Sequence, residues 1–304
     1  MSELVLDPHK SAQSTKEAIS ALCVRSDAKG AARLATHVAV LALTGCIVYV
    51  SIGSLWLVPA MLLHGVVIGT LFAIVHEGVH YTAFQSRRIN EVAAWVAGCI
   101  IGLNSTFYRQ FHYEHHRFTQ DPERDPELGT APPTTFRDYA LRLSAIPYWR
   151  TRLTQMVAVA LGKFEAYQFV PRGKRDGVRR SIIVTFAIYG AVLVGSLLFN
   201  SALALWLWFA PLLLGQPILR FWLLCEHTGC SNEPDGFINT RSTLTIWPVR
   251  FLMWNMPFHA EHHLHPQIPF HALPAAHEKI GKNFTHVANG YIETNLKLLA
   301  AMRS

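Results

Sequence analysis

Histidines gather in three short clusters of the sequence, and imidazole is the commonest metal ligand among protein side chains. The clusters are His76-Glu-Gly-Val-His80, His112-Tyr-Glu-His115-His116 and His259-Ala-Glu-His262-His263. Spacings of three and four residues place side chains on one face of an α-helix, close enough to share a ligand. Each cluster therefore predicts a helix with one face able to bind a metal ion.

The composition indicates a membrane protein. Hydrophobic residues make up 51% of the 304 residues and charged residues only 15%, whereas soluble domains carry about 25% charged residues. The stretches 34–76 and 181–217 contain no Lys, Arg, Asp or Glu. Each is long enough for two membrane crossings of roughly 20 residues. We therefore expect transmembrane helices at about residues 34–54, 60–80, 181–199 and 202–224.

The basic residues predict how these helices are oriented. They flank the open ends of both predicted hairpins, whereas the hairpin tips carry no charge. Under the positive-inside rule, this pattern places both termini in the cytoplasm. The net charge of +7 does not indicate nucleic acid, because the basic residues are not interleaved with aromatic residues along a polar stretch. The predicted fold is an all-α membrane protein, with two helical hairpins and a helical cytoplasmic cap that carries the histidine clusters.

The chain divides into three predicted parts. They are a cytoplasmic segment at 1–33, a membrane domain at 34–280 whose cytoplasmic cap comprises 81–180 and 225–280, and a cytoplasmic tail at 281–304. The protein is expected to be a multi-pass protein of a bacterial inner membrane or the endoplasmic reticulum. The five cysteines form no C-x-x-C pair, and Cys46 and Cys99 lie in apolar runs, so free thiols are expected.

This topology brings the histidines to one place. The first cluster ends the second crossing, His227 follows the fourth, and the other two clusters belong to the cap, so all lie at the same membrane face. Eight clustered histidines exceed the ligand set of one ion, which indicates two metal ions. Imidazole binds iron, copper, zinc and nickel, and a structural zinc site is closed by four ligands. Two ions with open positions beside an oxidisable apolar substrate favour iron and O2.

In this order and setting, the clusters resemble the histidine boxes of the membrane fatty acid desaturase and hydroxylase family. Neighbouring sequence agrees at Glu226-His227-Thr-Gly-Cys, Asn239-Thr-Arg241-Ser-Thr-Leu-Thr and Trp254-Asn255-Met-Pro-Phe. The resemblance covers roughly residues 34–280. It implies an O2-dependent centre of two iron ions (Fe2+/Fe3+) whose ligands are His76, His80, His112, His115, His116, His227, His259, His262 and His263.

Six further polar side chains lie close to these histidines in the sequence: Glu77, Glu114, Glu261, Asp121, Asp125 and Asn255. They are placed to accept a hydrogen bond from the far ring nitrogen of a ligand histidine. Solvated positions or ion pairs, for Asp121 and Asp125 with Arg117 or Arg124, are an equal alternative. Six further histidines are not expected to be ligands. Of these, His37 and His64 are expected to pack within the crossings, and the others are His265, His271, His277 and His286.

Other functions explain only part of the pattern. The first cluster matches the H-E-x-x-H motif of zinc proteases, but that function leaves two clusters and His227 unexplained. A metal transporter needs polar residues at the bilayer midplane, whereas these histidines gather at one end of the helices. A haem-binding electron carrier needs only two to four histidines that face each other across the bilayer.

The sequence therefore predicts an enzyme that oxidises an unactivated C–H bond in the acyl chain of a lipid, either an acyl-lipid or an acyl-thioester. Desaturation gives a double bond, and hydroxylation with the same centre gives an alcohol. The clusters do not distinguish the two outcomes, because the difference lies in substrate placement. The sequence has no flavin or dinucleotide fingerprint, cytochrome b5-like segment or iron–sulfur cysteine pattern. We therefore expect a separate electron donor, ferredoxin or cytochrome b5 with its reductase.

Overall fold

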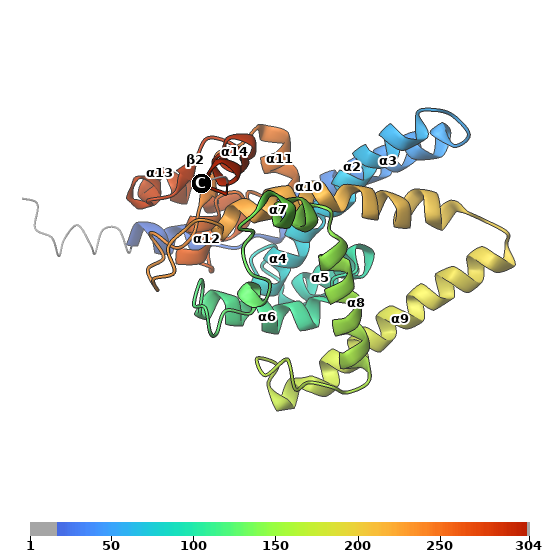
Figure 1. Cartoon of the computed structure of the whole chain (residues 1–304), viewed down its shortest axis with the longest axis horizontal. Coiled ribbons are helices and arrows are strands. Elements are labelled where there is room, and N and C mark those ends of the chain that lie inside the picture. Colours follow the sequence, from blue (N-terminus) through green and yellow to red (C-terminus); the bar gives the residue numbers. More distant parts are fainter. Residues whose placement is uncertain (1–16, 303–304) are drawn as a thin grey trace, which may run out of the picture.

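The computed structural model describes residues 17–302, so the first part of the predicted N-terminal segment and the end of the predicted tail lie outside the described residues. Helices dominate the described chain (Figure 1). In chain order, the α-helices are α2 (Asp27–Ser51), α3 (Leu57–Thr70), α4 (Phe72–His80), α5 (Arg87–Ile101), α6 (Ser105–Arg117), α7 (Phe136–Leu143), α8 (Ile146–Ala160), α9 (Arg175–Leu198), α10 (Ala210–His227), α11 (Trp247–Leu252), α12 (His259–Leu264), α13 (Leu273–Ile280) and α14 (Tyr291–Ala301).

Shorter elements connect these helices. The 3-10 turns are η1 (Ala21–Cys23), η2 (Pro126–Gly129), η3 (Arg172–Lys174), η5 (Phe270–Ala272) and η6 (Gly281–Asn283), and a π-helical turn, η4 (Leu205–Phe209), leads directly into α10. The strands β1 (Ser242–Thr243) and β2 (Val287–Ala288) pair in parallel. The predicted all-α membrane fold is confirmed.

Four helical segments are long and apolar enough to cross a membrane: Asp27–Ser51, Leu57–His80, Arg172–Leu198 and Leu205–His227. The second comprises α3 and α4, separated only by Leu71. The predicted crossings lie on these segments, but the first and third segments begin earlier in the chain than expected. Helical hydrogen bonding continues into the charged residues before each apolar run, because a charged side chain does not end a helix.

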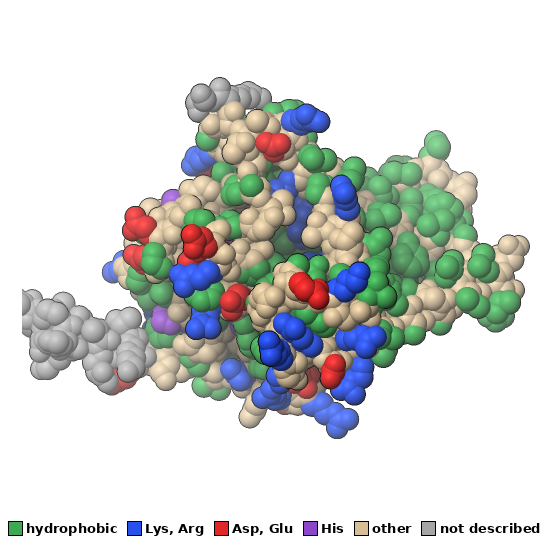
Figure 2. All heavy atoms as spheres, turned by 60° about the horizontal axis from the view of Figure 1, so that its bottom comes forward, with side chains coloured by type: hydrophobic (Ala, Val, Ile, Leu, Met, Phe, Trp, Pro, Cys, Tyr) green, Lys and Arg blue, Asp and Glu red, His purple; other side chains and the backbone are tan. Residues whose placement is uncertain are grey.

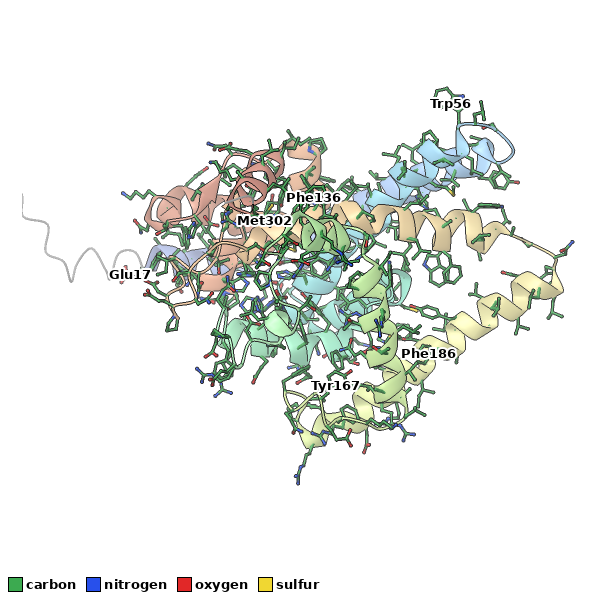
Figure 3. The ribbon with its side chains drawn as sticks, viewed as in Figure 1. Glu17, Trp56, Phe136, Tyr167, Phe186 and Met302 are labelled. Carbon is green, nitrogen blue, oxygen red and sulfur yellow. The ribbon has the colours of Figure 1, made fainter. Side chains whose placement is uncertain are left out.

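The segments form two hairpins, α2 with α3 and α9 with α10, and both hairpins point away from the remaining helices (Figure 1). Their tips are apolar and exposed. Trp56 is 73% exposed and points outward at the first tip (Figure 3), and Phe199 is 83% exposed at the second. Exposed apolar groups of this size are expected where helices contact lipid. On the face shown in Figure 2, Lys and Arg side chains gather beside this apolar region.

Helices α3 and α10 cross at a contact made by two glycines. A Cβ atom added to Gly65 would lie 2.0 Å from the carbonyl oxygen of Pro211, and one added to Gly215 would lie 2.0 Å from the carbonyl carbon of Gly65. Small residues at a crossing let two helix backbones approach closely, as in membrane bundles generally. This contact fixes the second and fourth apolar segments relative to each other, and both segments end in clustered histidines.

The main hydrophobic core lies where the hairpins meet the cap. It contains residues of α3, α4, α5, α10 and the segment before α12, and Trp254 is its largest fully buried side chain. The indole Nε1 of Trp254 donates to Nδ1 of His37 on α2 over 3.2 Å, and Oγ1 of Thr70 on α3 lies 3.3 Å from the other ring nitrogen of His37. The core therefore joins the first hairpin to the chain that leads into the third histidine cluster.

Candidate metal centre

The structure brings the nine predicted histidines together from four helices. Five of them, His76, His80, His112, His116 and His262, each offer a ring nitrogen within 4.8 Å of the others, and His115, His227 and His263 do the same in a second group. The groups adjoin, because the rings of His116 and His263 stack with centroids 4.0 Å apart and planes 9° apart. The arrangement has the form of two neighbouring metal sites.

The ninth histidine, His259, lies between the two groups. Its Nε2 is 3.2 Å from Nε2 of His227, and its ring centroid is 4.5 Å from that of His263 and 5.9 Å from that of His76. His259 therefore faces the second group on one side and the first on the other.

Local backbone features set each helix in position. The side chain of Asn104 caps the start of α6 by accepting from the backbone N–H of Phe107 over 3.1 Å, as N-cap residues do. Helix α4 ends at His80 and is followed by Tyr81, whose φ is 60°. Trp254 and Asn255, with φ of 50° and 59°, turn the chain sharply before α12. Left-handed conformations at non-glycine residues are uncommon and concentrate at functional sites.

The spacing between ring nitrogens fits shared metal ligands. Nε2 of His116 lies 3.1 Å from Nε2 of His112 and 3.2 Å from Nε2 of His262. Two imidazole nitrogens that each lie about 2.1 Å from one ion, at a right angle, are about 3 Å apart. Three ring nitrogens at this separation can therefore bind a common cation.

Five of the rings also have the orientation typical of metal-bound histidine. Their Nδ1 atoms lie within 3.3 Å of an oxygen atom: that of Glu77 for His76, Tyr108 for His112, Asp125 for His115, Asn239 for His227 and Thr119 for His263. Among the described residues, Nε2 of His76, His115 and His263 is buried and has no hydrogen-bond partner. In a metal-bound histidine, one ring nitrogen usually forms a hydrogen bond with the protein while the other is free to bind the metal ion. The residues present therefore fit a metal centre.

Five histidines of the cap have a lowered pKa, which favours the neutral form of the ring. Burial, together with the neighbouring imidazoles, lowers the pKa well below the usual histidine value in His112, His116, His259, His262 and His263. His115 differs. Burial alone would lower its pKa, but the carboxylates of Glu127 and Asp125 outweigh burial and raise it. A neutral imidazole is the form that binds a metal ion.

The six predicted supporting residues have different surroundings. Glu77 lies 3.3 Å from His76 Nδ1 and also accepts from the hydroxyl of Thr82, and Asp125 lies 2.9 Å from His115 Nδ1. Both carboxylates therefore lie at hydrogen-bonding distance from a ring nitrogen of a clustered histidine.

The other four contact different groups. Glu261 contacts Ser242 and His277 rather than a clustered histidine. Asp121 pairs with Arg124, which was the predicted alternative, and Asn255 donates to the carbonyl of Phe270. Within residues 17–302, no hydrogen bond involves the Glu114 side chain.

Several contacts to the clustered histidines were not predicted. Tyr108 stacks on His112 with planes 16° apart and lies four residues before it, so helical spacing identifies this residue. Thr119 reaches His263 from a distant part of the chain, which no local pattern reveals. Glu127 and Glu226 place carboxylate oxygens 3.8 Å from His115 Nε2 and 3.6 Å from His259 Nε2.

The remaining described histidines lie outside both groups. His64 lies within the apolar segments, where it contacts the hydroxyl of Thr44 and the carbonyl of Leu207. His37 contacts Thr70 and Trp254, and His271 contacts Lys29. Neither His265 nor His286 belongs to either group.

A pocket of about 540 Å³ opens beside the centre. Its wall includes His116 and His263, together with residues of the 118–124 and 232–239 loops. The pocket connects the polar surface of the cap to the two stacked rings.

Comparison with known proteins agrees with this geometry. The family model described as fatty acid desaturase matches residues 28–295. The dihydrorhizobitoxine desaturase of Bradyrhizobium elkanii is 27% identical over 272 residues, which cover 81% of this chain and 74% of that protein. The sphingolipid delta(4)-desaturase of Drosophila melanogaster is 28% identical over 238 residues, which cover 75% and 67%. The predicted resemblance is confirmed: the chain belongs to the fatty acid desaturase family and is an oxidoreductase.

Proposed function

We propose that this protein is an O2-dependent desaturase that introduces a double bond into the acyl chain of a lipid. The observation that carries the proposal is the pair of adjoining histidine groups at one end of four membrane-length helices. Membership of the family supports the reaction class. Both relatives are named desaturases, which favours double-bond formation over hydroxylation. The fly relative is named for sphingolipids, which supports a lipid substrate. We propose an acyl-lipid or an acyl-thioester as that substrate.

Two iron ions are the proposed cofactors, because imidazole ligands suit iron and the oxidation of an unactivated C–H bond requires redox chemistry. When bound, the ions supply the activation of O2. The proposed ligands are His76, His80, His112, His115, His116, His227, His259, His262 and His263.

The protein's own groups orient these ligands and shield some of them from water. Glu77 and Asp125 hold the Nδ1 atoms of His76 and His115, and Tyr108 lies against the ring of His112. His112 and His262 are at most 2% exposed, so bulk water has little access to these two rings. Hydrogen bonds that fix a ligand ring also set its basicity, and their loss typically weakens metal binding.

The overall reaction requires an external reductant. Two hydrogen atoms leave neighbouring carbons of the substrate, and O2 takes up these together with two further electrons and two protons to form two molecules of water. We propose ferredoxin or cytochrome b5, with its reductase, as the source of these electrons. The pocket that reaches His116 and His263 offers a short route from the polar surface to the centre.

The membrane arrangement follows the distribution of charge. We propose that the four apolar segments cross a bacterial inner membrane or the endoplasmic reticulum membrane, with both termini and the histidine groups on the cytoplasmic side. The division at residues 33 and 280 into a cytoplasmic segment, a membrane domain and a cytoplasmic tail belongs to the same proposal.

Lipid profiling tests the proposed function. Lipids of a host that expresses the chain together with an electron donor are compared with those of the host alone. A new unsaturated lipid that requires O2 is the expected result and identifies the substrate. A new hydroxylated lipid, or a change that persists without O2, would contradict desaturation.

We expect Asp125→Asn to weaken metal binding about 10- to 100-fold, because the amide is a poorer acceptor for the ring N–H of His115. The carboxylate of Asp125 lies 2.9 Å from His115 Nδ1 and is buried. Iron retention during titration with a chelator measures the effect. Asp121→Asn is the matched control, since Asp121 pairs with Arg124 near the surface. Equal iron retention in both variants would show that Asp125 does not position His115.

A further inference from the structure

A group of hydrogen-bond donors lies between α8 and α10 and has no part in the metal centre. Among the described residues, Arg220 makes no hydrogen bond or ion pair through its guanidinium group, and its Nε is buried. Nε2 of Gln216, one helical turn earlier on α10, and Nε1 of Trp149 on α8 are also buried and have no hydrogen-bond partner among the described residues. A buried donor without an acceptor loses the hydrogen bonds that water would supply. These donors therefore need an acceptor.

The aromatic ring of Tyr148 joins the two helices at this point. The guanidinium carbon of Arg220 lies 4.3 Å from the ring centroid, and that of Arg152 lies 5.4 Å from it. Tyr148 and Arg152 share one face of α8, and Gln216 and Arg220 share one face of α10. The ring of Trp149 lies beside that of Tyr148, with centroids 5.0 Å apart. Two cationic side chains therefore meet at one ring.

Among the described residues, neither arginine forms an ion pair with a carboxylate. Within residues 17–302, no Asp or Glu lies within 4.0 Å of either guanidinium group, and Arg152 donates only to the amide of Gln155. Glu127 and Glu226 lie within electrostatic range of Arg220, but their carboxylate oxygens approach His115 and His259 instead. A cation within a membrane-spanning helix is costly unless paired, and such residues commonly mark a functional site.

The arginines adjoin the metal centre through Tyr108. Tyr108 lies within electrostatic range of both Arg152 and Arg220, and its ring stacks on His112 with centroids 4.9 Å apart. Along α10, Arg220 precedes His227 by seven residues, which is about 10 Å of helix. A group bound at Arg220 therefore lies close to the histidines.

We propose that Arg220 and Arg152, with Trp149 and Gln216, bind the anionic oxygen atoms of the substrate's head group, either a carboxylate or a phosphate. A guanidinium group matches both anions through paired hydrogen bonds. This proposal rests on the proposed desaturase function and names its substrate class. Binding of the head group at this site would also determine which carbons are oxidised. Because the site is close to the histidines, the new double bond would form near the head group, at a fixed number of carbons from it.

Ligand binding tests the proposal without turnover. Purified protein in dodecyl maltoside, a neutral detergent, is loaded with tritiated palmitate, which is then displaced by palmitate, hexadecyl phosphate or neutral methyl palmitate. The anionic ligands are expected to bind about tenfold or more tightly than methyl palmitate, which is the strength of one charge-assisted hydrogen bond. The better of the two anions identifies the head group as carboxylate or phosphate. Inorganic phosphate, which has no alkyl chain, shows how strongly the phosphate group binds by itself.

Arg220→Gln and Arg152→Gln are each expected to remove the preference for anionic ligands. Arg150→Gln is the matched control, because Arg150 lies on the exposed face of the same helix, and it should keep the preference. Elution as a single species in size-exclusion chromatography verifies folding, and Arg152→Gln supplies the test if Arg220→Gln does not fold. Equal binding of methyl palmitate and palmitate to the unmodified protein would overturn the proposal. Retention of the preference in both variants, or displacement by inorganic phosphate as effective as by hexadecyl phosphate, would also overturn it.

A chain-length series adds the regiochemical test. Substrates of increasing length should give a double bond at a constant position from the head group, and a constant position from the methyl end would contradict the inference. Absence of any lipid oxidation, with the anion preference intact, would instead contradict the proposed function alone.

Discussion

His116→Ala is expected to abolish the new unsaturated lipid while the protein still inserts into the membrane. Nε2 of His116 lies 3.1 and 3.2 Å from ring nitrogens of His112 and His262, and its ring stacks on His263 of the second group. Removal of this ring therefore affects both groups at once. The product should fall below detection in the lipid profile, and iron content should fall with it.

The matched control for this variant is His265→Ala. His265 immediately follows α12 but belongs to neither histidine group, so its loss should leave iron content and product formation near the level of the unmodified protein. Product formation by the His116 variant at the level of the His265 variant would contradict the assignment of His116 as a ligand.

Gly65→Ala is expected to destabilise the protein by about 1–3 kcal/mol or more, because the added methyl group overpacks the crossing of α3 and α10. The new Cβ would lie 2.0 Å from the backbone oxygen of Pro211, which a side-chain rotation cannot relieve. The helices must separate, and His227 at the end of α10 must move relative to α4. The thermal unfolding midpoint in detergent and the iron content measure the two consequences.

A glycine with free space around it provides the comparison. Gly190, on α9, has nothing within 4 Å of an added Cβ. Gly190→Ala should therefore be neutral or stabilising by up to about 1 kcal/mol, because alanine loses less conformational entropy than glycine in a helix. Equal midpoints for Gly65→Ala and Gly190→Ala would show that the glycine contact is not close-packed in the protein.

The helical hairpins and the meeting of the histidines could be predicted because each depends on a simple periodic signal. Uncharged runs of fixed length specify the crossings, and spacings of three and four residues place the rings of α4, α6 and α12 on one face each. Two hairpins with the same orientation then bring these faces to one end of the bundle. The position of His227 at the end of α10 follows from the same topology.

The supporting contacts could be predicted only where they are local. Asp125 reaches His115 within one turn and loop of the chain, whereas Glu261 pairs with His277 because α13 folds back beside α12. That return depends on the turn after α12 and on packing against a separate core cluster, which no short motif specifies. The contact of Thr119 with His263 could not be predicted from the sequence for the same reason: it depends on how distant segments pack together.

The segment 137–168 illustrates a further limit. Its basic, aromatic and aliphatic residues follow a helical pattern, yet the structure has two helices, α7 and α8, separated at Ala145. Ala145 has a φ of 59°, and Pro147 follows at the start of α8. Proline is tolerated in the first turn of a helix but not in its interior, so a new helix begins just before Pro147. After the break, α8 runs so that the ring of Tyr148 contacts Arg220 of α10.

The metal content of the purified protein tests the central claim most directly. Elemental analysis of the chain, purified without chelators, is expected to find two iron ions per chain, with both lost in a variant that lacks His116 and His263. One zinc ion per chain, with no iron after reconstitution under reducing conditions, would contradict a dinuclear iron centre. That result would instead favour the interpretation of the first histidine cluster as a zinc-protease motif.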